Sequence, residues 1–174
     1  MATALATPFY IDLGYDLTTI GIVAKNIGIW STVIGSLLGG VIMTRIGINK
    51  ALWLFGLVQM ITIVGFWLLA YAGAEATPSV WLFALVLLGE YLGVGLGGGG
   101  IVTFIAVCTN PRFTALQFAL LTSLSAIPRT FCNATTGFIV EAVGWEQFFI
   151  ICTLLALPGL VLLHYVAPFG EKQN

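Results

Sequence analysis

Residues 89–129 read GEYLGVGLGGGGIVTFIAVCTNPRFTALQFALLTSLSAIPR, and this stretch decides how the chain folds. It places two ionisable residues, Glu90 and Arg129, inside apolar runs that are each long enough to cross a lipid bilayer. A short polar turn around Pro111 joins the two runs. Because charges at that depth are costly, they usually serve a function. The stretch therefore predicts two membrane-spanning helices that line a polar pathway.

The composition places the whole chain in a membrane. Only 7% of its 174 residues are charged while 59% are hydrophobic, and the mean hydropathy is +1.06. Soluble domains carry about 25% charged residues. The net charge of −1 gives no basic surface, so we expect the lipid bilayer as a partner and no nucleic acid.

Cysteine and histidine residues give no sign of a metal or catalytic centre. Cys108, Cys132 and Cys152 are odd in number, lack metal-type spacing and fall in or beside apolar runs. His164 is the only histidine in the sequence, and no acid or nucleophile stands near it. We expect no disulfide, no metal site, no cofactor and no enzymatic activity.

Breaks in hydropathy divide the chain into helices, which predicts an all-α membrane protein in one transmembrane domain, residues 1–174. Asp16 can cap the first full span, and Thr77 can cap the third with Pro78 at its first position. The prediction is a partial helix at 1–11 followed by five full spans at about 17–44, 51–72, 79–108, 115–140 and 147–167.

Charges alternate between successive loops, which predicts the orientation. Arg45 and Lys50 occupy one loop, Arg112 another and Lys172 the tail, whereas the loops between them carry Asp or Glu. By the positive-inside rule, the basic loops and the C-terminus are expected in the cytoplasm.

Charged residues inside the spans are unevenly distributed. Lys25, Glu90 and Arg129 lie in the first, third and fourth full spans, which should face protein or water. The second and fifth spans have no charge in their interior, and their most polar members are Gln59 and His164. We expect these two spans to be lipid-facing scaffold.

Depth counting compares the three charges. At about 1.5 Å per residue from the outer end, Lys25 lies roughly 12 Å deep, and Glu90 and Arg129 both lie roughly 17 Å deep. Glu90 and Arg129 could therefore pair. Pro128 predicts a kink beside Arg129. Spacings of three and four residues put a polar stripe on one face of this span, formed by Thr122, Ser125, Arg129, Asn133 and Thr136.

The loop GGVIMTRIGINKA, residues 39–51, resembles the cytoplasmic loop motif of the major facilitator superfamily, in which a Gly-rich helix end precedes Asp-Arg-x-Gly-Arg-type residues. Arg45, Gly47 and Lys50 match this motif, and Thr44 stands where it often has Asp.

More specifically, GIVAKNIGIWSTVIGSLLGGVIM, the helix around Glu90, CTNPRFTALQFALLTSLSAIPR and GFIVEAVGW look like the C-terminal half of AmpG-type muropeptide permeases. This resemblance covers nearly the whole chain. It implies a proton-driven symporter that brings anhydromuropeptides from the periplasm across the bacterial inner membrane. The matched positions include Lys25, Glu90, Gln117, Phe118 and Arg129.

The resemblance also implies a fold. In the family's twelve-helix arrangement the chain would supply the end of helix seven and helices eight to twelve, that is, the C-terminal six-helix half with its first helix truncated. Helices eight, ten and eleven flank the central cavity in that superfamily, while nine and twelve are peripheral.

Each candidate residue has a functional and a structural interpretation. Arg129 could hold a substrate carboxylate or form a structural ion pair, and Glu90 could carry a proton or serve as a static counter-ion. Lys25 could face the cavity or extend toward the interface. Ser125 and Asn133 are weaker candidates, since such residues more often form interhelical hydrogen bonds.

Two functions of different class follow. The chain could be half of a transporter that works by alternating access, with a glycopeptide as its small-molecule substrate. It could instead be a truncated permease relic that serves as a structural or assembly subunit of a larger membrane complex. Both hypotheses require a partner over the cavity face, either an N-terminal half-transporter or another membrane protein.

Overall fold

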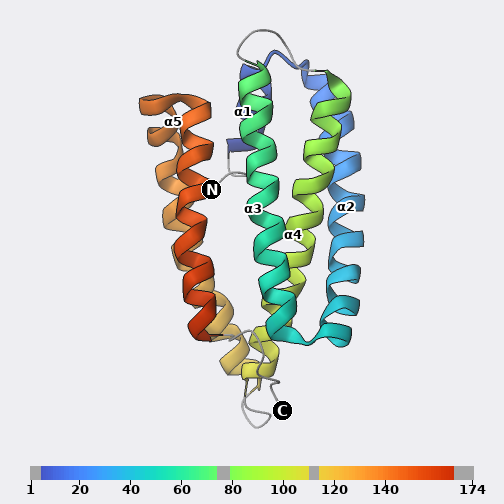
Figure 1. The fold of residues 1–174 in the computed structure, drawn as a ribbon, viewed down its shortest axis with the longest axis vertical. Coiled ribbons are helices and arrows are strands. Elements are labelled where there is room, and N and C mark those ends of the chain that lie inside the picture. Colours follow the sequence, from blue (N-terminus) through green and yellow to red (C-terminus); the bar gives the residue numbers. More distant parts are fainter. Residues whose placement is uncertain (1–4, 74–78, 110–113, 167–174) are drawn as a thin grey trace.

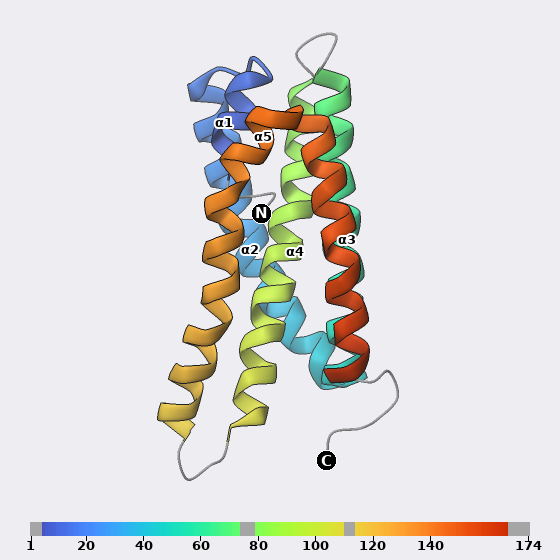
Figure 2. The ribbon, with the colours of Figure 1, turned by 90° about the vertical axis from the view of Figure 1, so that its left-hand side faces the viewer.

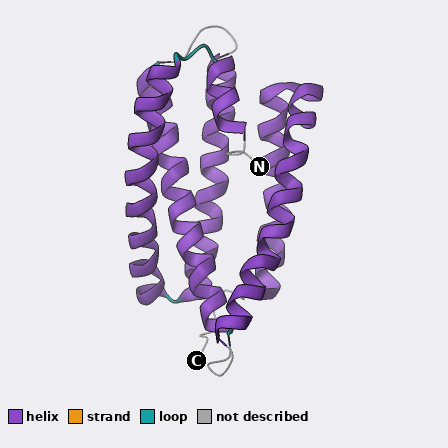
Figure 3. Cartoon of the chain, turned by 180° about the vertical axis from the view of Figure 1, so that it is seen from behind, coloured by secondary structure: helices purple, strands orange, loops and turns teal. Residues whose placement is uncertain are grey.

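The computed structural model describes residues 5–73, 79–109 and 114–166, and no strand occurs within these ranges. Helices account for nearly all of the described chain (Figures 1 and 3). Four of them are long and apolar enough to cross a membrane, which confirms the predicted all-helical class. The helices are α1 (Ala6–Asp12), α2 (Leu17–Ile46), α3 (Ile48–Gly73), α4 (Val80–Cys108) and α5 (Thr114–Val166).

The α5 helix supplies two spans. Gly144, with φ 79° and ψ 171°, is the non-helical residue inside it. Residues 114–143, the first limb, and residues 145–166, the second limb, run in opposite directions on either side of Gly144 (Figure 2). The separate helices predicted at 115–140 and 147–167 are therefore joined with almost no loop. The break lies at Gly144 rather than beside Pro128, where the backbone keeps helical angles.

Polar caps set two of the helix starts. The Asp16 carboxylate accepts a hydrogen bond from the backbone N–H of Thr18 at 3.0 Å, which confirms the predicted cap of α2. At α4 the cap is Ser79, whose hydroxyl oxygen accepts from the N–H of Leu82 at 3.3 Å. The predicted cap Thr77 was wrong for this helix start, and that residue lies outside the described ranges.

Gly47 alone connects α2 to α3. Its N–H donates to Met43 O at 3.0 Å and its carbonyl accepts from the N–H of Ala51 at 3.1 Å. The backbone angles of Gly47, φ 86° and ψ 156°, lie in a region that is essentially restricted to glycine. This one-residue turn therefore fixes the relative direction of α2 and α3.

The helices pack unevenly. The α2 and α4 helices share the most extensive contact, α3 packs on α4, and the second limb of α5 packs on α3. The first limb makes far less contact with α4 than α2 does, and its residues are largely exposed. Side chains from α1, α3, α4 and the second limb form an aromatic core near α1, comprising Phe9, Tyr10, Phe66, Phe83, Phe148 and Phe149.

Candidate functional site

Glu90 is one of the most deeply buried side chains of the protein. It lies on α4 with 2% of its surface exposed. Both carboxylate oxygens accept a hydrogen bond from Nε2 of Gln59 on α3, each at 3.1 Å. A carboxyl group in an apolar span is therefore held by an amide of the neighbouring helix.

Thr62 and two glycines complete the surroundings of this carboxyl. The Thr62 hydroxyl donates to the Gln59 carbonyl at 2.9 Å, and Gln59 Nε2 lies 3.3 Å from the same hydroxyl oxygen. On α4, a Cβ at Gly93 would lie 3.1 Å from Gln59 Oε1, and one at Gly89 would lie 3.7 Å from Thr62 Cγ2. The absence of side chains at both glycines gives the polar groups of α3 room to reach Glu90.

The interpretation of the second full span as lipid-facing scaffold was wrong for this part of α3. Gln59 and Thr62 stand three residues apart in an otherwise apolar helix, so both project from one face. This spacing was the signal that the sequence offered. Neither residue is charged, so the distribution of charges among the spans did not reveal it.

The structure does not form the pair of Glu90 and Arg129 that their similar depth would allow. Glu90 hydrogen-bonds to Gln59, whereas Arg129 lies exposed on the first limb of α5. No ion pair joins the two side chains, both of which the structure describes. Depth counting gives the height of a residue along its helix, but it does not give the direction in which the side chain points.

The polar stripe of the first limb lies on its inner side. At about 100° per residue, its members fall within an arc of about 80°; they are Thr122, Ser125, Arg129, Asn133 and Thr136. Thr136 is 1% exposed, so this face turns toward the bundle where the limb meets it. Large exposed apolar side chains, including Leu124, Phe131 and Phe138, occupy the opposite face. The first limb thus has an apolar outer face and a polar inner face.

Asn133 and Ser125 differ within that stripe. The Ser125 hydroxyl donates to Thr122 O of its own helix at 2.7 Å. Asn133 is half-buried, and its Oδ1 is a buried atom with no hydrogen-bond partner among the described residues. Its backbone carbonyl accepts from the Thr136 hydroxyl at 2.6 Å. Asn133 therefore retains an acceptor for a further group, while Ser125 is satisfied locally.

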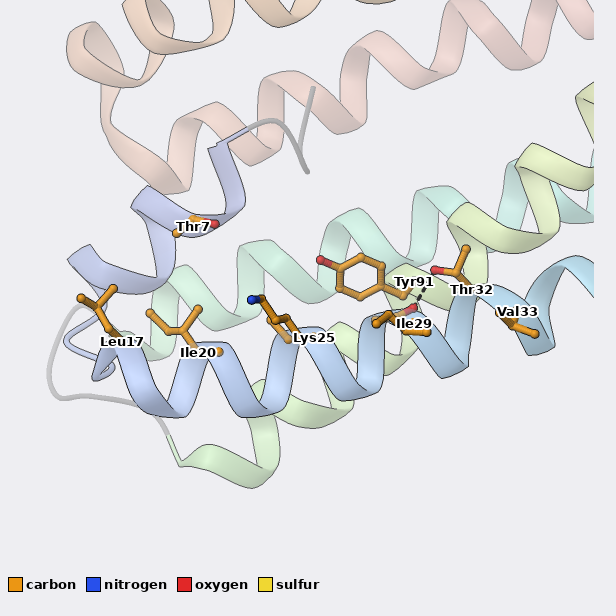
Figure 4. Close-up of a pocket in the computed structure, with 11 residues that line it drawn as sticks. Thr7, Leu17, Ile20, Lys25, Ile29, Thr32, Val33 and Tyr91 are labelled. Atoms are coloured by element: carbon orange, nitrogen blue, oxygen red, sulfur yellow. Dashed lines mark hydrogen bonds between the residues drawn. The ribbon is translucent and has the colours of Figure 1, made fainter.

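Lys25 lines an open hollow of about 720 Å³ between α1, α2 and α4. Its side chain and that of Tyr91 point from α2 and α4 into this space, and Thr7 of α1 lies at its end (Figure 4). Thr32 also lines the hollow, and its hydroxyl donates to Gly28 O at 2.7 Å. The rest of the lining is mainly apolar, so Lys25 is the charged group among the described lining residues.

The residues of the loop motif lie at the turn between α2 and α3. Arg45 is exposed in the last turn of α2, where a cation is favourable next to the helix C-terminus. Gly47 makes the turn, and Lys50 is exposed in the first turn of α3. The basic residues Arg112 and Lys172 lie outside the described ranges.

Comparisons with known proteins confirm the resemblance over nearly the whole chain, although no model of a protein family matches it. The chain is 46% identical over 176 residues to an uncharacterized protein of Haemophilus influenzae, covering 99% of the chain and 41% of that protein. It is 35% identical over 163 residues to an anhydromuropeptide permease of Escherichia coli, covering 93% of the chain and 32% of the permease. A putative transporter AmpG 4 of Rickettsia conorii is 34% identical over 167 residues, 39% of its length. The chain thus spans about two fifths or less of these relatives.

Proposed function

We propose that the chain forms one wall of a transport pathway for glycopeptide-class solutes, as half of a proton-coupled transporter in the bacterial inner membrane. Its apolar spans and its permease relatives make it a multi-pass membrane protein with a transporter-like fold. The substrate class comes from the name of the Escherichia coli relative, an anhydromuropeptide permease. The alternating basic loops favour a cytoplasmic C-terminus.

The observation that carries this proposal is the polarity of the first limb of α5. Large apolar side chains occupy its outer face, while Arg129, Asn133 and Thr136 lie on its inner face. In a bilayer an arginine within a span must face protein or water. The inner face is therefore suited to lining a hydrated path, where the Arg129 guanidinium can bind a carboxylate through two parallel hydrogen bonds.

A second wall is required for such a path. Arg129 is exposed, and the first limb makes little contact with α2 and α4. Lys25 and the hollow beside Tyr91 are open as well. We propose that an N-terminal half-transporter, or another membrane protein, covers this side of the bundle. The two halves then expose the path to each side of the membrane in turn.

Uptake of labelled anhydromuropeptide tests the proposal. The chain is produced together with the part of the Escherichia coli permease that it does not cover, in cells without a permease of their own. We expect uptake only when both parts are present, and loss of uptake when a protonophore collapses the proton gradient. Arg129→Ala should reduce uptake at least tenfold.

Thr130→Ala is the matched control, because Thr130 is an exposed neighbour whose position on the helix falls outside the polar stripe. Full uptake in this variant would tie the Arg129 effect to the inner face. If no combination of the two parts restores uptake, the transport proposal fails, and the structural-subunit hypothesis is then favoured. Undiminished uptake by Arg129→Ala would remove this residue from the pathway.

A further inference from the structure

We propose that Glu90, Gln59 and Thr62 form a proton-binding site between α3 and α4, in which Glu90 is a neutral carboxylic acid at neutral pH. Its use for coupling rests on the proposed transport function. Proton binding itself can be measured without substrate, so the two proposals can fail separately.

The Glu90 carboxyl is buried, and no basic side chain of the described residues pairs with it. Glu90 is 2% exposed, and its oxygens contact the amide of Gln59 rather than a basic side chain. No Lys, Arg or His among the described residues lies within ion-pair distance of it. A carboxylate buried in this way lacks the solvation of water, and no basic side chain of the described residues pairs with it, so binding a proton removes a costly buried charge.

Among the described residues, the other titratable side chains around Glu90 do not supply that cation. From α1, Tyr10 lies within electrostatic reach of the carboxyl, and on α4 so does its sequence neighbour Tyr91. A tyrosine is neutral at neutral pH. The α3 helix contributes the uncharged Gln59 and Thr62. Among the described residues, the groups that face Glu90 from each neighbouring helix are therefore all neutral.

Gln59 can satisfy the carboxyl group in both protonation states. An ionised carboxylate only accepts hydrogen bonds, and Gln59 Nε2 lies 3.1 Å from each of its oxygens. A protonated carboxyl has one donor and one acceptor, which match the carbonyl and the N–H of a primary amide. A rotation of the Gln59 amide would bring Oε1 to accept the acid proton while Nε2 still donates. Gln59 can therefore hydrogen-bond to Glu90 both when the carboxyl is protonated and when it has released the proton.

The position of the site on α4 relates it to the hollow. Glu90 and Tyr91 are consecutive and so lie about 100° apart around the helix. Tyr91 lines the hollow, whereas Glu90 faces α3. The proton site is therefore screened from the open side of the bundle. A proton can exchange only when α4 moves relative to α3, which would make protonation dependent on the conformational change of the transporter.

Infrared spectroscopy of the purified chain in lipid nanodiscs tests proton binding. A protonated carboxyl has a carbonyl stretching band that is separate from the bands of a carboxylate. We expect this band at neutral pH and its loss in Glu90→Gln, which keeps the shape of the side chain. Glu141→Gln and Glu146→Gln are the matched controls, because both residues are exposed, and these variants should retain the band.

A second variant tests the role of Gln59 independently of whether Glu90→Gln folds. Gln59→Met keeps the length of the side chain but removes the amide, so the carboxyl band should persist and move to higher frequency. A band that is absent at neutral pH, or that survives in Glu90→Gln, would overturn the proposal. So would a carboxylate band that responds to added sodium ions in the wild-type chain and not in Glu90→Gln, since it would identify the ligand as a metal cation.

Discussion

Gly35 of α2 and Gly95 of α4 face each other so closely that neither position has room for a methyl group. A Cβ on Gly35 would lie 2.6 Å from Leu92 O, and a Cβ on Gly95 would lie 2.5 Å from Thr32 O. Both obstructing atoms belong to the backbone, so a side-chain rotation cannot relieve the clash. Small residues of this kind allow membrane helices to pack at short distance.

Gly35→Ala and Gly95→Ala should each destabilise the chain. Forcing α2 and α4 apart costs about 1 to 3 kcal/mol, as for other overpacked interiors. The matched controls are Gly40→Ala on α2 and Gly97→Ala on α4, where a Cβ meets no atom within 4 Å. The controls should be neutral or gain up to about 1 kcal/mol from the helix propensity of alanine. Unfolding in detergent, followed by circular dichroism, measures the difference, and equal effects in all four variants would contradict this packing.

Alanine at Gly47 or Gly144 should also destabilise the chain, for a different reason. Both glycines have positive φ with extended ψ, and a Cβ at either meets no atom within 4 Å. Backbone strain of this kind costs about 1 to 3 kcal/mol. Gly137→Ala, in a helical and open position of the first limb, serves as the control in the same unfolding assay. Stability equal to that of the control would show that these turns relax without strain.

Trp145 ties the turn of α5 to the end of α1. Its indole Nε1 donates to Asp12 Oδ2 at 2.9 Å, and its ring packs 4.9 Å from that of Phe9. Trp145→Phe keeps a ring and removes the donor, so we expect a loss of about 1 kcal/mol. A double-mutant cycle with Asp12→Ala, which removes the acceptor, isolates the hydrogen bond. Additive effects of the two substitutions would show that this bond contributes nothing to stability.

The Asp16 carboxyl should make the stability of the folded chain depend on pH in the acid range. Hydrogen bonding from Thr18 lowers the pKa of the Asp16 carboxyl below its ordinary value. A group with a lowered folded pKa stabilises fully above its unfolded pKa, about 3.9, and loses this contribution as the pH falls through the folded pKa. Asp16→Asn keeps the cap but cannot titrate, so its melting temperature should fall less steeply below about pH 4. Parallel curves for the two proteins would exclude Asp16 as a source of the acid sensitivity.

The sequence correctly predicted features that depend on position along a helix axis. Hydropathy identified the spans, and Asp16 identified the start of α2. Rotation about the helix axis was harder to predict, because it depends on which helices become neighbours. Glu90 and Arg129 were predicted at similar depths in the membrane, but their side chains point in different directions, and Glu90 faces Gln59. Within the first limb of α5 the residue spacing was sufficient, since the helix itself sets the relative direction of Arg129, Asn133 and Thr136.

The short connection at Gly144 bears on how the chain enters a membrane. A span that carries an arginine near its centre is costly to insert, by about 2.5 to 3.5 kcal/mol for that residue. Beyond Glu146 the second limb contains no acidic residue, lysine or arginine. With Gly144 as the non-helical residue between them, the two limbs can insert as one helical hairpin, in which the apolar limb compensates for the polar one. We therefore expect stable insertion of the Arg129 limb to depend on synthesis of the second limb.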